Sequence, residues 1–332
     1  MTRPTELDSA VAEIIFLGPN AQITLGELAK RTRASVQEIG ESIQRLSMLG
    51  YPLNPKSDSI ERLPIHTINT QELEASLSSW RIGRRIEWKL HVHSTQEEMK
   101  KLCQEAPDGT VLLAETQDFG RGRLGRRWFS PLGGIWMSLL LKPSWPKSHQ
   151  ILPLALGAAL TKAIRATTGI STSLKWPNDV TIQSRKVAGI LSEATYEGDK
   201  LGSVIVGVGV NANVRSTTLP KGLDRIATSL SHELRKDVDR NVLTLRTLEE
   251  MDKTYRIFEA GQGTELLNDV RQVCSTIGRK VEVTTTGGHF EGEAQQIGGN
   301  GQLIVRLRNG ETAQFYAGDT VHLHDGHRSR LE

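Results

Sequence analysis

The spacing of apolar and polar residues divides the chain into three zones that predict different structures. In residues 8–50 the apolar residues recur at helical intervals, which predicts three short helices. From Ile86 onward, apolar and polar residues alternate in short runs that predict strands at 86–92, 110–116, 135–141, 171–176, 180–183, 186–195 and 203–212. Helices are expected at 94–103, 150–168 and 240–268. This mixture predicts an α/β protein whose central domain contains a largely antiparallel sheet.

The N-terminal zone has the spacing of a winged helix-turn-helix unit. Two capping boxes, Thr24–Glu27 and Ser35–Glu38, each predict the start of a helix. The second helix would place Val36, Ile39, Ile43 and Leu46 on one face, and residues 51–66 would form a small β wing. The candidate DNA-contacting residues are Thr24, Ser35, Gln37, Gln44 and Arg45. A generic three-helix packing module remains an alternative, because this helix carries two glutamates but only one base.

The C-terminal zone, residues 276–324, predicts a small all-β domain. Gly287–Gly288, Asn300–Gly301 and Asn309–Gly310 separate alternating runs, which is typical of hairpin turns. About five short strands in this length indicate an SH3-like barrel. The expected domains are therefore residues 1–65, 66–272 and 273–332.

Composition narrows the class of protein. At 332 residues the chain is long enough to bury a core without disulfides or structural metals. Cys103 and Cys274 are isolated, so we expect no zinc site and a reducing compartment. The N-terminus lacks an apolar signal segment, and the most apolar stretch, 151–160, contains a proline and is too short to span a bilayer. These features predict a cytoplasmic protein without membrane association.

Charge is distributed unevenly although the net charge is only +3. Between Asp118 and Asp179 the chain has no acidic residue but nine basic ones: Arg121, Arg123, Arg126, Arg127, Lys142, Lys147, Lys162, Arg165 and Lys175. Such a segment indicates an anionic partner, with chance clustering on a solvated face as the alternative.

The start of this segment, GRGRLGRRW at 120–128, holds four arginines and three glycines. It matches G-x-G-x-x-G, but no helix and no acidic residue follow as a dinucleotide fold requires. A Walker loop is also absent, and a single copy between hydrophobic strands is atypical of RNA-binding arginine-glycine segments. We interpret it as a flexible loop that closes on a phosphate or carboxylate, with Trp128 covering the ligand. A solvated basic loop is the alternative.

Two further stretches carry candidate chemistry. In LKWPNDVTIQSRKVAGILSE, residues 174–193, a turn at Pro177–Asp179 precedes Lys186, which is expected at a sheet edge or in a cleft. In GVGVNANV, residues 207–214, Gly207 and Gly209 leave one face of a strand without side chains, which makes room for a ligand or marks a bulge. Ser94 and Glu97 form a third capping box.

In this order, GRGRLGRRWFSP, KWPNDVTIQSRKVAGILSE and GVGVN resemble the biotin protein ligases. With its two flanking domains the chain is similar end to end to bifunctional biotin ligases that also repress the biotin operon. The resemblance implies a class II synthetase-like catalytic domain, with ATP and Mg²⁺ as cofactors and biotin as substrate. It implies formation of biotinyl-5′-AMP and transfer to the biotin carboxyl carrier protein of acetyl-CoA carboxylase. Operator DNA, a homodimer and biotinyl-AMP as corepressor are the further implied partners.

The resemblance also implies residue roles. Catalysis falls to Lys186, Arg121 and Arg123. The implied biotin-binding residues are Ser94, Thr95, Gln96, Gln117, Arg121, Gly122, Arg123 and Lys186. Those shaping the ATP and adenylate region are Gly120, Gly125, Trp128, Asn178, Asp179, Gly207 and Asn211, with Asp179 near Mg²⁺.

Asp118 departs from the expected pattern, since it puts an acid beside the anion-binding loop. Three alternatives stay open. One is a ligase with a vestigial helix-turn-helix, one is a DNA-binding regulator that senses biotinyl-AMP, and one is a lipoate ligase, against which the glycine-arginine loop argues.

Overall fold

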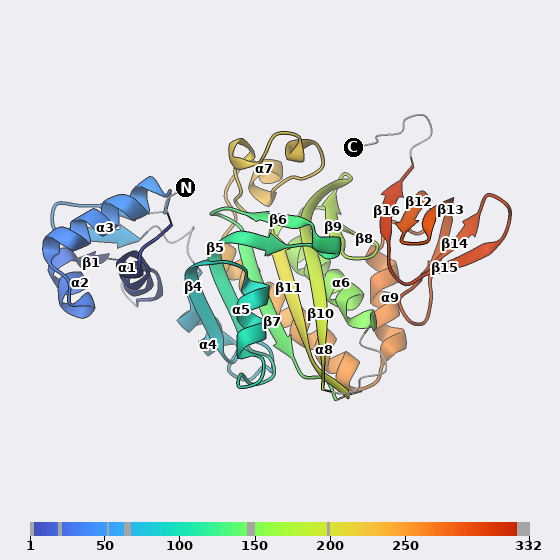
Figure 1. The fold of residues 1–332 in the computed structure, drawn as a ribbon, viewed down its shortest axis with the longest axis horizontal. Helices are drawn as coiled ribbons and strands as arrows, with labels where there is room; N and C mark the ends of the chain where they lie inside the picture. The colour runs from blue at the N-terminus through green and yellow to red at the C-terminus, as the bar shows by residue number, and fades with distance from the viewer. Residues whose placement is uncertain are drawn as a thin grey trace. The chain divides into compact units, whose positions relative to one another are not determined.

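The structure is a computed structural model that describes residues 3–18, 22–51, 53–62, 68–144, 150–197 and 200–323. The chain divides into two compact units, Met1–Lys142 with Leu191–Glu249 and Pro143–Ile190 with Glu250–Glu332. Figure 1 labels their helices and strands. The predicted domain limits at 65 and 272 stay predictions.

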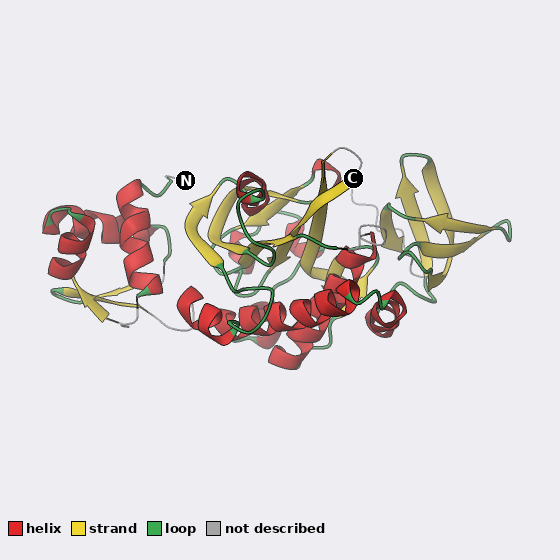
Figure 2. Ribbon diagram, turned by 90° about the horizontal axis from the view of Figure 1, so that it is seen from below, coloured by secondary structure: helices red, strands yellow, loops and turns green. Residues whose placement is uncertain are grey.

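The first unit begins with a small helical module. Its elements are α1 (Glu6–Leu17), β1 (Gln22–Thr24), α2 (Leu25–Thr32), α3 (Val36–Met48), β2 (Leu53–Pro55) and β3 (Ser59–Arg62). The strands form an antiparallel sheet in the order β1-β3-β2, and Figure 2 shows them grouped with the three helices. Ile39, Ile43 and Leu46 are buried as predicted. Val36, the first residue of α3, is 52% exposed and does not belong to the core.

Helix starts in this module follow the predicted capping only in part. The Ser35–Glu38 box is complete, because each side chain accepts from the other residue's backbone amide. Thr24 Oγ1 accepts from the Glu27 amide at 3.1 Å, but the Glu27 carboxylate lies 4.0 Å from Arg31 instead of returning to the cap. Thr24 therefore makes half of the predicted box.

The rest of the first unit is built on a sheet. It contains β4 (Ile86–Val92), β5 (Val111–Arg121), β6 (Arg127–Ser130), β7 (Ile135–Leu141) and β11 (Lys200–Val210), together with the second half of β10 (Arg185–Glu197). Strands β4 and β5 are parallel, whereas β5–β7 and β7–β11 are antiparallel, as the sequence predicted in the main. Helix α5 (Thr95–Leu102) connects the parallel pair and buries Met99 against Leu112, Leu140 and Ile205.

Shorter elements complete the first unit. They are α4 (Thr70–Ser76), α7 (Leu230–Leu234), the start of α8 (Arg240–Glu259) and the 3₁₀ turns η2 (Arg123–Gly125), η4 (Ser216–Thr218) and η5 (Leu223–Arg225). Glu115 on β5 and Arg240 at the start of α8 form a buried ion pair of 2.9 Å. Arg240 also donates to the Gly134 carbonyl, and Glu115 accepts from Trp88 Nε1 at 3.3 Å, so each partner has a further hydrogen bond inside the core.

The second unit contains α6 (Leu152–Thr168), β8 (Ser173–Lys175), β9 (Asp179–Ile182), the first half of β10, the end of α8, and α9 (Gly263–Val273). Its C-terminal part is a five-stranded antiparallel sheet in the order β15-β14-β13-β12-β16. These strands are β12 (Lys280–Thr285), β13 (Gly288–Ile297), β14 (Leu303–Leu307), β15 (Thr312–Phe315) and β16 (Asp319–His322). The predicted all-β zone with about five strands is confirmed.

The tryptophan of the KWPND motif joins this β domain to the rest of the second unit. The Trp176 amide donates to Thr276 Oγ1, and its indole Nε1 donates to the Gly301 carbonyl, both at 3.0 Å. The side chain is 2% exposed. Across the described ranges, none of the helices is both long and apolar enough to cross a membrane.

Candidate active site

A network of polar side chains lies where β4 ends and α5 begins. Val92 is paired with Gln117 in the parallel β4–β5 ladder, so the start of α5 and the end of β5 meet at one edge of the sheet. Thr95 donates to Gln117 Oε1 from its amide at 2.8 Å and from Oγ1 at 3.1 Å. Gln117 Nε2 donates to Ser130 Oγ at 2.9 Å. The structure therefore brings together Thr95 and Gln117, which the resemblance assigned to biotin.

Ser94 does not form the predicted capping box with Glu97. It precedes α5 with a φ of −160°, whereas the capping residues Thr24 and Ser35 have φ values of −81° and −73°. Its hydroxyl makes no cap hydrogen bond, and the Glu97 carboxylate turns to Lys100 and Arg121. Among the described residues Ser94 Oγ is buried without a hydrogen-bond partner. A buried hydroxyl in this state costs free energy, and a bound polar ligand would satisfy it.

Ser138 belongs to the same network, and sequence reasoning missed it. Its hydroxyl lies 2.9 Å from Thr95 Oγ1 and 3.1 Å from Gln96 Oε1, and its single proton can serve one acceptor at a time. Gln96 Nε2 donates to the Ile205 carbonyl at 3.0 Å. The signal was available, since Ser138 is the one polar residue in the apolar run 135–141. A hydroxyl in such a strand needs a buried polar partner.

The space above Gly207 and Gly209 is filled by protein side chains. A Cβ at position 207 would lie 2.8 Å from Gln96 Oε1, and one at 209 would lie 2.8 Å from the indole of Trp128. Trp128 also packs edge-on against Trp136, with ring centroids 6.5 Å apart. These glycines therefore make room for Gln96 and Trp128. Room for a ligand beside them stays a prediction.

The glycine-arginine segment, interpreted from the sequence as a flexible loop, is mostly a β-hairpin formed by β5 and β6. Strand β5 continues to Arg121, with Gly120 paired to Trp128 and Arg121 to Arg127. Gly122 donates its amide to the Arg126 carbonyl at 2.7 Å. The irregular part is confined to η2, where Leu124 and Gly125 take φ values of 56° and 74°. A Cβ at Gly120 would lie 2.5 Å from both Ser130 Oγ and the Trp128 carbonyl, so close pairing requires glycine there.

The two arginines assigned to the ligand lie at different points of this hairpin. Arg121 ends β5, and its guanidinium pairs with Glu97 and lies 3.8 Å from a carboxylate oxygen of Glu193 on β10. Arg123 opens η2 and is half-buried, and its carbonyl accepts from the Arg126 amide at 3.2 Å.

The unexpected Asp118 lies beside one arginine and one histidine. Its carboxylate lies 2.8 Å from the Arg3 guanidinium and 3.2 Å from His91 Nε2. His91 Nδ1 lies 2.9 Å from Thr116 Oγ1. The carboxylate beside the hairpin therefore has its polar contacts within the first unit.

In the second unit, Lys186 and Asp179 form an ion pair of 2.6 Å between β10 and β9. The ladder is irregular between Lys186 and Ala188. The expected position of Lys186 at a sheet edge or in a cleft stays a prediction. Lys175 on β8 belongs to this group and was not assigned a role from the sequence. Burial lowers the pKa of Lys175, as does the charge of Lys186, while Asp179 and Asp319 oppose the shift. Asn178 donates to the Ile190 carbonyl at 2.6 Å and so ties the turn to β10.

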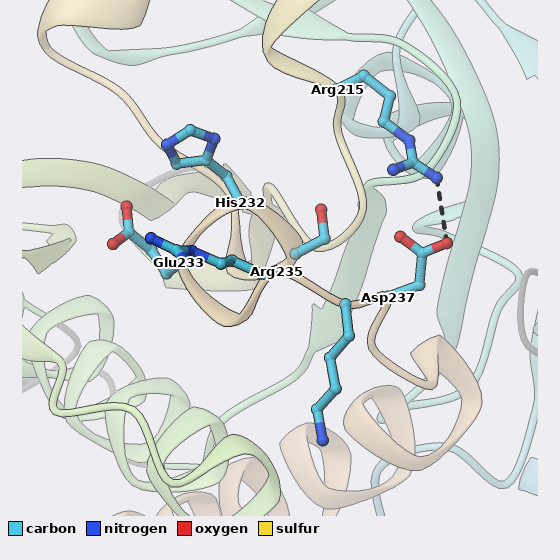
Figure 3. A pocket seen from close by; sticks show the side chains of 7 residues that line it. Arg215, His232, Glu233, Arg235 and Asp237 are labelled. Atoms are coloured by element: carbon cyan, nitrogen blue, oxygen red, sulfur yellow. Dashed lines mark hydrogen bonds and ion pairs between the residues drawn. The ribbon is translucent and has the colours of Figure 1, made fainter.

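Asn211 holds the chain that follows β11. Its side chain donates to the Thr228 carbonyl at 2.9 Å, and its carbonyl accepts from the Leu230 amide. Near this point a pocket of about 690 Å³ is lined by Arg215, Ser231, His232, Glu233, Arg235, Lys236 and Asp237 (Figure 3). Arg215 and Asp237 pair at 3.2 Å. None of the site residues inferred from the sequence lines this pocket, so the candidate active site is the network around Thr95.

The candidate DNA-contacting residues lie on the N-terminal module. Thr24 and Ser35 cap α2 and α3, and Gln44 is exposed. Gln37 is exposed and donates to Glu41 at 3.2 Å. Arg45 is partly exposed, and its guanidinium lies 3.0 Å from the buried carboxylate of Asp8 on α1.

Asp8 is the buried charge of the N-terminal module. It also accepts from Ser42 Oγ at 2.7 Å and from the Thr5 amide at 2.8 Å. Burial would raise the pKa of Asp8, but the hydrogen bonds from Arg45, Ser42 and Thr5 outweigh it and lower the pKa.

No cluster of three or more His, Cys, Asp or Glu side chains suited to a metal occurs in the described part of the chain. Magnesium is commonly held by one or two carboxylates together with substrate phosphates. Asp179 is a hard oxygen donor of this type, and it is half-buried beside two lysines that suit phosphates. The donor chemistry therefore fits Mg²⁺ bound mainly through a nucleotide.

Known proteins resemble this chain over most of its length. Residues 83–211 match the Biotin/lipoate A/B protein ligase family, and residues 276–323 match the Biotin protein ligase C terminal domain. The chain is 33% identical over 284 residues to the bifunctional ligase/repressor BirA of Bacillus spizizenii, covering 84% of each chain.

Two further relatives resemble a smaller share of the chain. One is the biotin--[acetyl-CoA-carboxylase] ligase of Mycobacterium tuberculosis, 34% identical over 224 residues that cover 65% of this chain and 80% of that one. A solved structure, the biotin protein ligase from Aquifex aeolicus in complex with biotin and ATP, superposes with a TM-score of 0.65. It is 32% identical and covers 72% of this chain and 98% of that chain.

Proposed function

The chain belongs to the biotin protein ligase family, and from this premise we propose that it couples biotin to a carrier protein in two steps. A biotin carboxylate oxygen attacks the α-phosphorus of ATP, and pyrophosphate leaves, giving biotinyl-5′-AMP. The amine of a lysine on the biotin carboxyl carrier protein of acetyl-CoA carboxylase then attacks the acyl carbon. AMP leaves and the amine loses a proton, so that an amide bond remains.

One observation carries the proposal. The hydroxyl of Ser94 is buried without a partner among the described residues, beside the linked side chains of Thr95, Gln96 and Gln117. A ureido ring presents one carbonyl acceptor and two N–H donors, and hydroxyl and amide groups can serve both kinds of atom. A site with such placed polar groups in apolar surroundings selects strongly against a ligand that lacks them.

For the adenylation step we assign the charged groups by their motifs. Arg121 and Arg123, with the backbone at Gly122, would hold the biotin carboxylate and the adenylate phosphate. Lys186 would stabilise the negative charge that develops on the reacting carboxyl and phosphate. When bound, Mg²⁺ would neutralise phosphate charge, and Asp179 is the carboxylate that would join its ligands.

The hairpin would also protect the product of the first step. A mixed acyl-phosphate anhydride is easily hydrolysed, so water must be kept away from it. Trp128, Gly120 and Gly125 would cover it, with η2 as the part that moves. Because the amide groups of Asn178 and Asn211 already hold backbone carbonyls, we assign them, with Gly207, a supporting role around the nucleotide.

Exchange of labelled pyrophosphate into ATP tests the ligase proposal. We expect exchange with biotin and Mg²⁺ and none with lipoate in place of biotin. Exchange with lipoate alone would favour a lipoate ligase, and no exchange with either acid would refute the proposal. Transfer is then followed with the organism's own carrier domain, using a carrier whose acceptor lysine is replaced by arginine as the control.

We further propose that the N-terminal module is a winged helix-turn-helix that represses a biotin operon. The order α1-β1-α2-α3-β2-β3 is that of a helix-turn-helix followed by a two-stranded wing, and relatives of similar length are bifunctional ligase/repressors. Gln37 and Gln44 are the exposed contact candidates on α3. Arg45 would have to leave Asp8 before it could contact DNA.

Binding to the organism's own biotin-operator DNA tests the repressor. We expect specific binding that biotin and ATP strengthen, accompanied by formation of a homodimer in sedimentation. Equal affinity for a scrambled sequence would indicate a ligase with a vestigial module. Operator binding without any adenylation would favour a pure regulator.

A further inference from the structure

Four charged side chains of alternating sign surround the end of β5, and we call them the Arg121 cluster: Glu97, Lys100, Arg121 and Glu193. Arg121 pairs with Glu97 and lies 3.8 Å from Glu193. Lys100 Nζ lies 3.2 Å from Glu97 and 3.3 Å from the other oxygen of Glu193. Two carboxylates thus share two cations, and the cluster is neutral.

Three elements of the first unit hold the cluster in place. Glu97 and Lys100 are one turn apart on α5, Arg121 ends β5, and Glu193 lies on β10. All four side chains are between 28% and 42% exposed, so a dissolved anion can reach them. Burial would raise the pKa of Glu97, but Lys100 and Arg121 outweigh it and lower the pKa, so this carboxylate is charged at neutral pH.

The carboxylates and an anionic ligand compete for the same guanidinium. The inference rests on the proposed function, in which Arg121 binds the biotin carboxylate or the adenylate phosphate. An anion that takes Arg121 must draw it from Glu97 and Glu193 or add a third negative charge close to them. Lys100 already contacts both carboxylates, so they keep a counterion when Arg121 turns to the ligand.

We propose that Glu97 and Glu193 are specificity-determining residues that withhold Arg121 from simple anions, and that Lys100 is the positioning residue that lets Arg121 be released. Sulfate, phosphate or a small carboxylate gains only the charge contact and cannot compensate for the loss of two carboxylates. Biotin also gains its hydrogen bonds and buried apolar surface elsewhere in the site. The cluster therefore makes anion binding depend on recognition of the rest of the ligand.

Two substitutions are expected to act in opposite directions on biotin binding by the full-length protein. Glu193→Gln removes a competitor and should tighten biotin binding by about threefold, the size of one partly exposed ion pair. Lys100→Met leaves Arg121 as the sole cation in the cluster and should weaken biotin binding by about threefold. The controls are Glu98→Gln and Lys101→Met, because Glu98 and Lys101 form a 2.8 Å pair on the same helix outside the cluster.

Sulfate provides the second readout. Calorimetric titrations with biotin are made at constant ionic strength in sodium chloride and in sodium sulfate. We expect sulfate to compete with biotin more strongly in Glu193→Gln than in the wild type and in both controls. Equal competition in all variants, or shifts of the same sign in Glu193→Gln and Lys100→Met, would overturn the proposal.

The proposed function fails in a different way. If the wild type gave no heat with biotin and no pyrophosphate exchange, the ligase assignment itself would be lost. If the wild type binds biotin normally but Glu193→Gln and Lys100→Met bind it like their control variants, the ligase assignment stands and the role of the cluster is refuted.

Discussion

Replacing Gly207 by alanine tests the packing of Gln96 in the Thr95 network, the hydrogen-bonded side chains of Thr95, Gln96, Gln117, Ser130 and Ser138. The added Cβ would lie 2.8 Å from Gln96 Oε1, a distance at which one of the two groups must move. Gln96 has little freedom to do so, because it is 3% exposed. Its amide is held by the Ile205 carbonyl at 3.0 Å and by Ser138 Oγ at 3.1 Å. A shift of Gln96 therefore breaks one of these bonds or displaces β11.

The loss in free energy of unfolding depends on whether the clash is tolerated by overpacking or relieved by breaking a hydrogen bond of Gln96. Overpacking a buried site costs about 1–3 kcal/mol, and a lost buried hydrogen bond costs about 0.5–1.5 kcal/mol. The two are alternative responses to the same clash, so we expect about 2 kcal/mol less stability. Because Ser138 links Gln96 to Thr95, biotin affinity should fall about tenfold, which corresponds to about 1.4 kcal/mol.

Urea unfolding and biotin titration measure both effects. The double variant Gln96→Ala/Gly207→Ala removes the clashing amide, so its loss of stability should be smaller than the sum of the two single losses. Gly40→Ala is the matched control, because its Cβ meets no atom within 4 Å, and it should stabilise helix α3 by about 0.5–1 kcal/mol. Unchanged stability and biotin affinity in Gly207→Ala would refute the contact between Gly207 and Gln96 as described.

Three other substitutions test separate parts of the molecule. Lys186→Ala should abolish pyrophosphate exchange while changing the free energy of unfolding by less than about 1 kcal/mol, since its ion pair is partly exposed; near-normal exchange would remove Lys186 from catalysis. Arg123→Gly should speed the release of biotinyl-AMP from the isolated enzyme–adenylate complex, because a cation is lost and η2 is loosened; unchanged release would contradict its role. Asp8→Asn should lower the thermal midpoint of the N-terminal module at pH 7, because the lowered pKa of Asp8 means that its charged form stabilises the folded state. That contribution is present above the unfolded pKa of about 3.9 and is lost as the pH falls through the folded pKa. The thermal midpoints of wild type and variant should therefore converge below about pH 4. A constant difference between the two midpoints down to about pH 2 would contradict the assignment.

Most elements were predictable because each is stabilised by its own local pattern. The strand runs at 86–92 and 135–141 became β4 and β7 with the same limits. Boundaries failed where pairing with a distant segment decided them. Strand β5 continues to Arg121 because β6 offers a partner to residues that resemble a loop in isolation. Val36 has the right spacing for the core but lies at the first turn of α3, where solvent reaches it.

The charge pattern of the sequence does not by itself give the local electrostatic field. The acid-free stretch from 119 to 178 predicted an anionic partner, but in three dimensions two of its cations pair with carboxylates from elsewhere in the chain. Arg121 pairs with Glu97 and Glu193, and Lys162 pairs with Asp269 at 2.7 Å. A run of like charges along the chain therefore says little about the local field until the partners are known.

The candidate site was predictable as motifs but not as contacts. The capping-box pattern at Ser94 was satisfied in sequence, yet the backbone angle at Ser94 leaves its hydroxyl unused by the helix. The partner of Gly207 is Gln96, 111 residues away, and no local pattern contains that information. Ser138 could have been selected from its buried strand, but the identity of its acceptors depends on the fold.

The parallel pairing of β4 and β5 has a consequence for how binding specificity can be engineered. Because α5 is the connection between these two strands, the residues from Ile86 to Arg121 form one continuous β-α-β segment. Ser94, Thr95, Gln96, Gln117 and Arg121 all lie within it. Five of the eight residues that the resemblance assigns to biotin thus lie in a single stretch of chain, and we expect a chimaera that exchanges only this segment with a relative to inherit much of the relative's preference among biotin analogues. Among the network contacts described above, Ser130, Ser138, Ile205 and Gly207 lie outside it, so these four positions must be matched for the exchanged segment to pack.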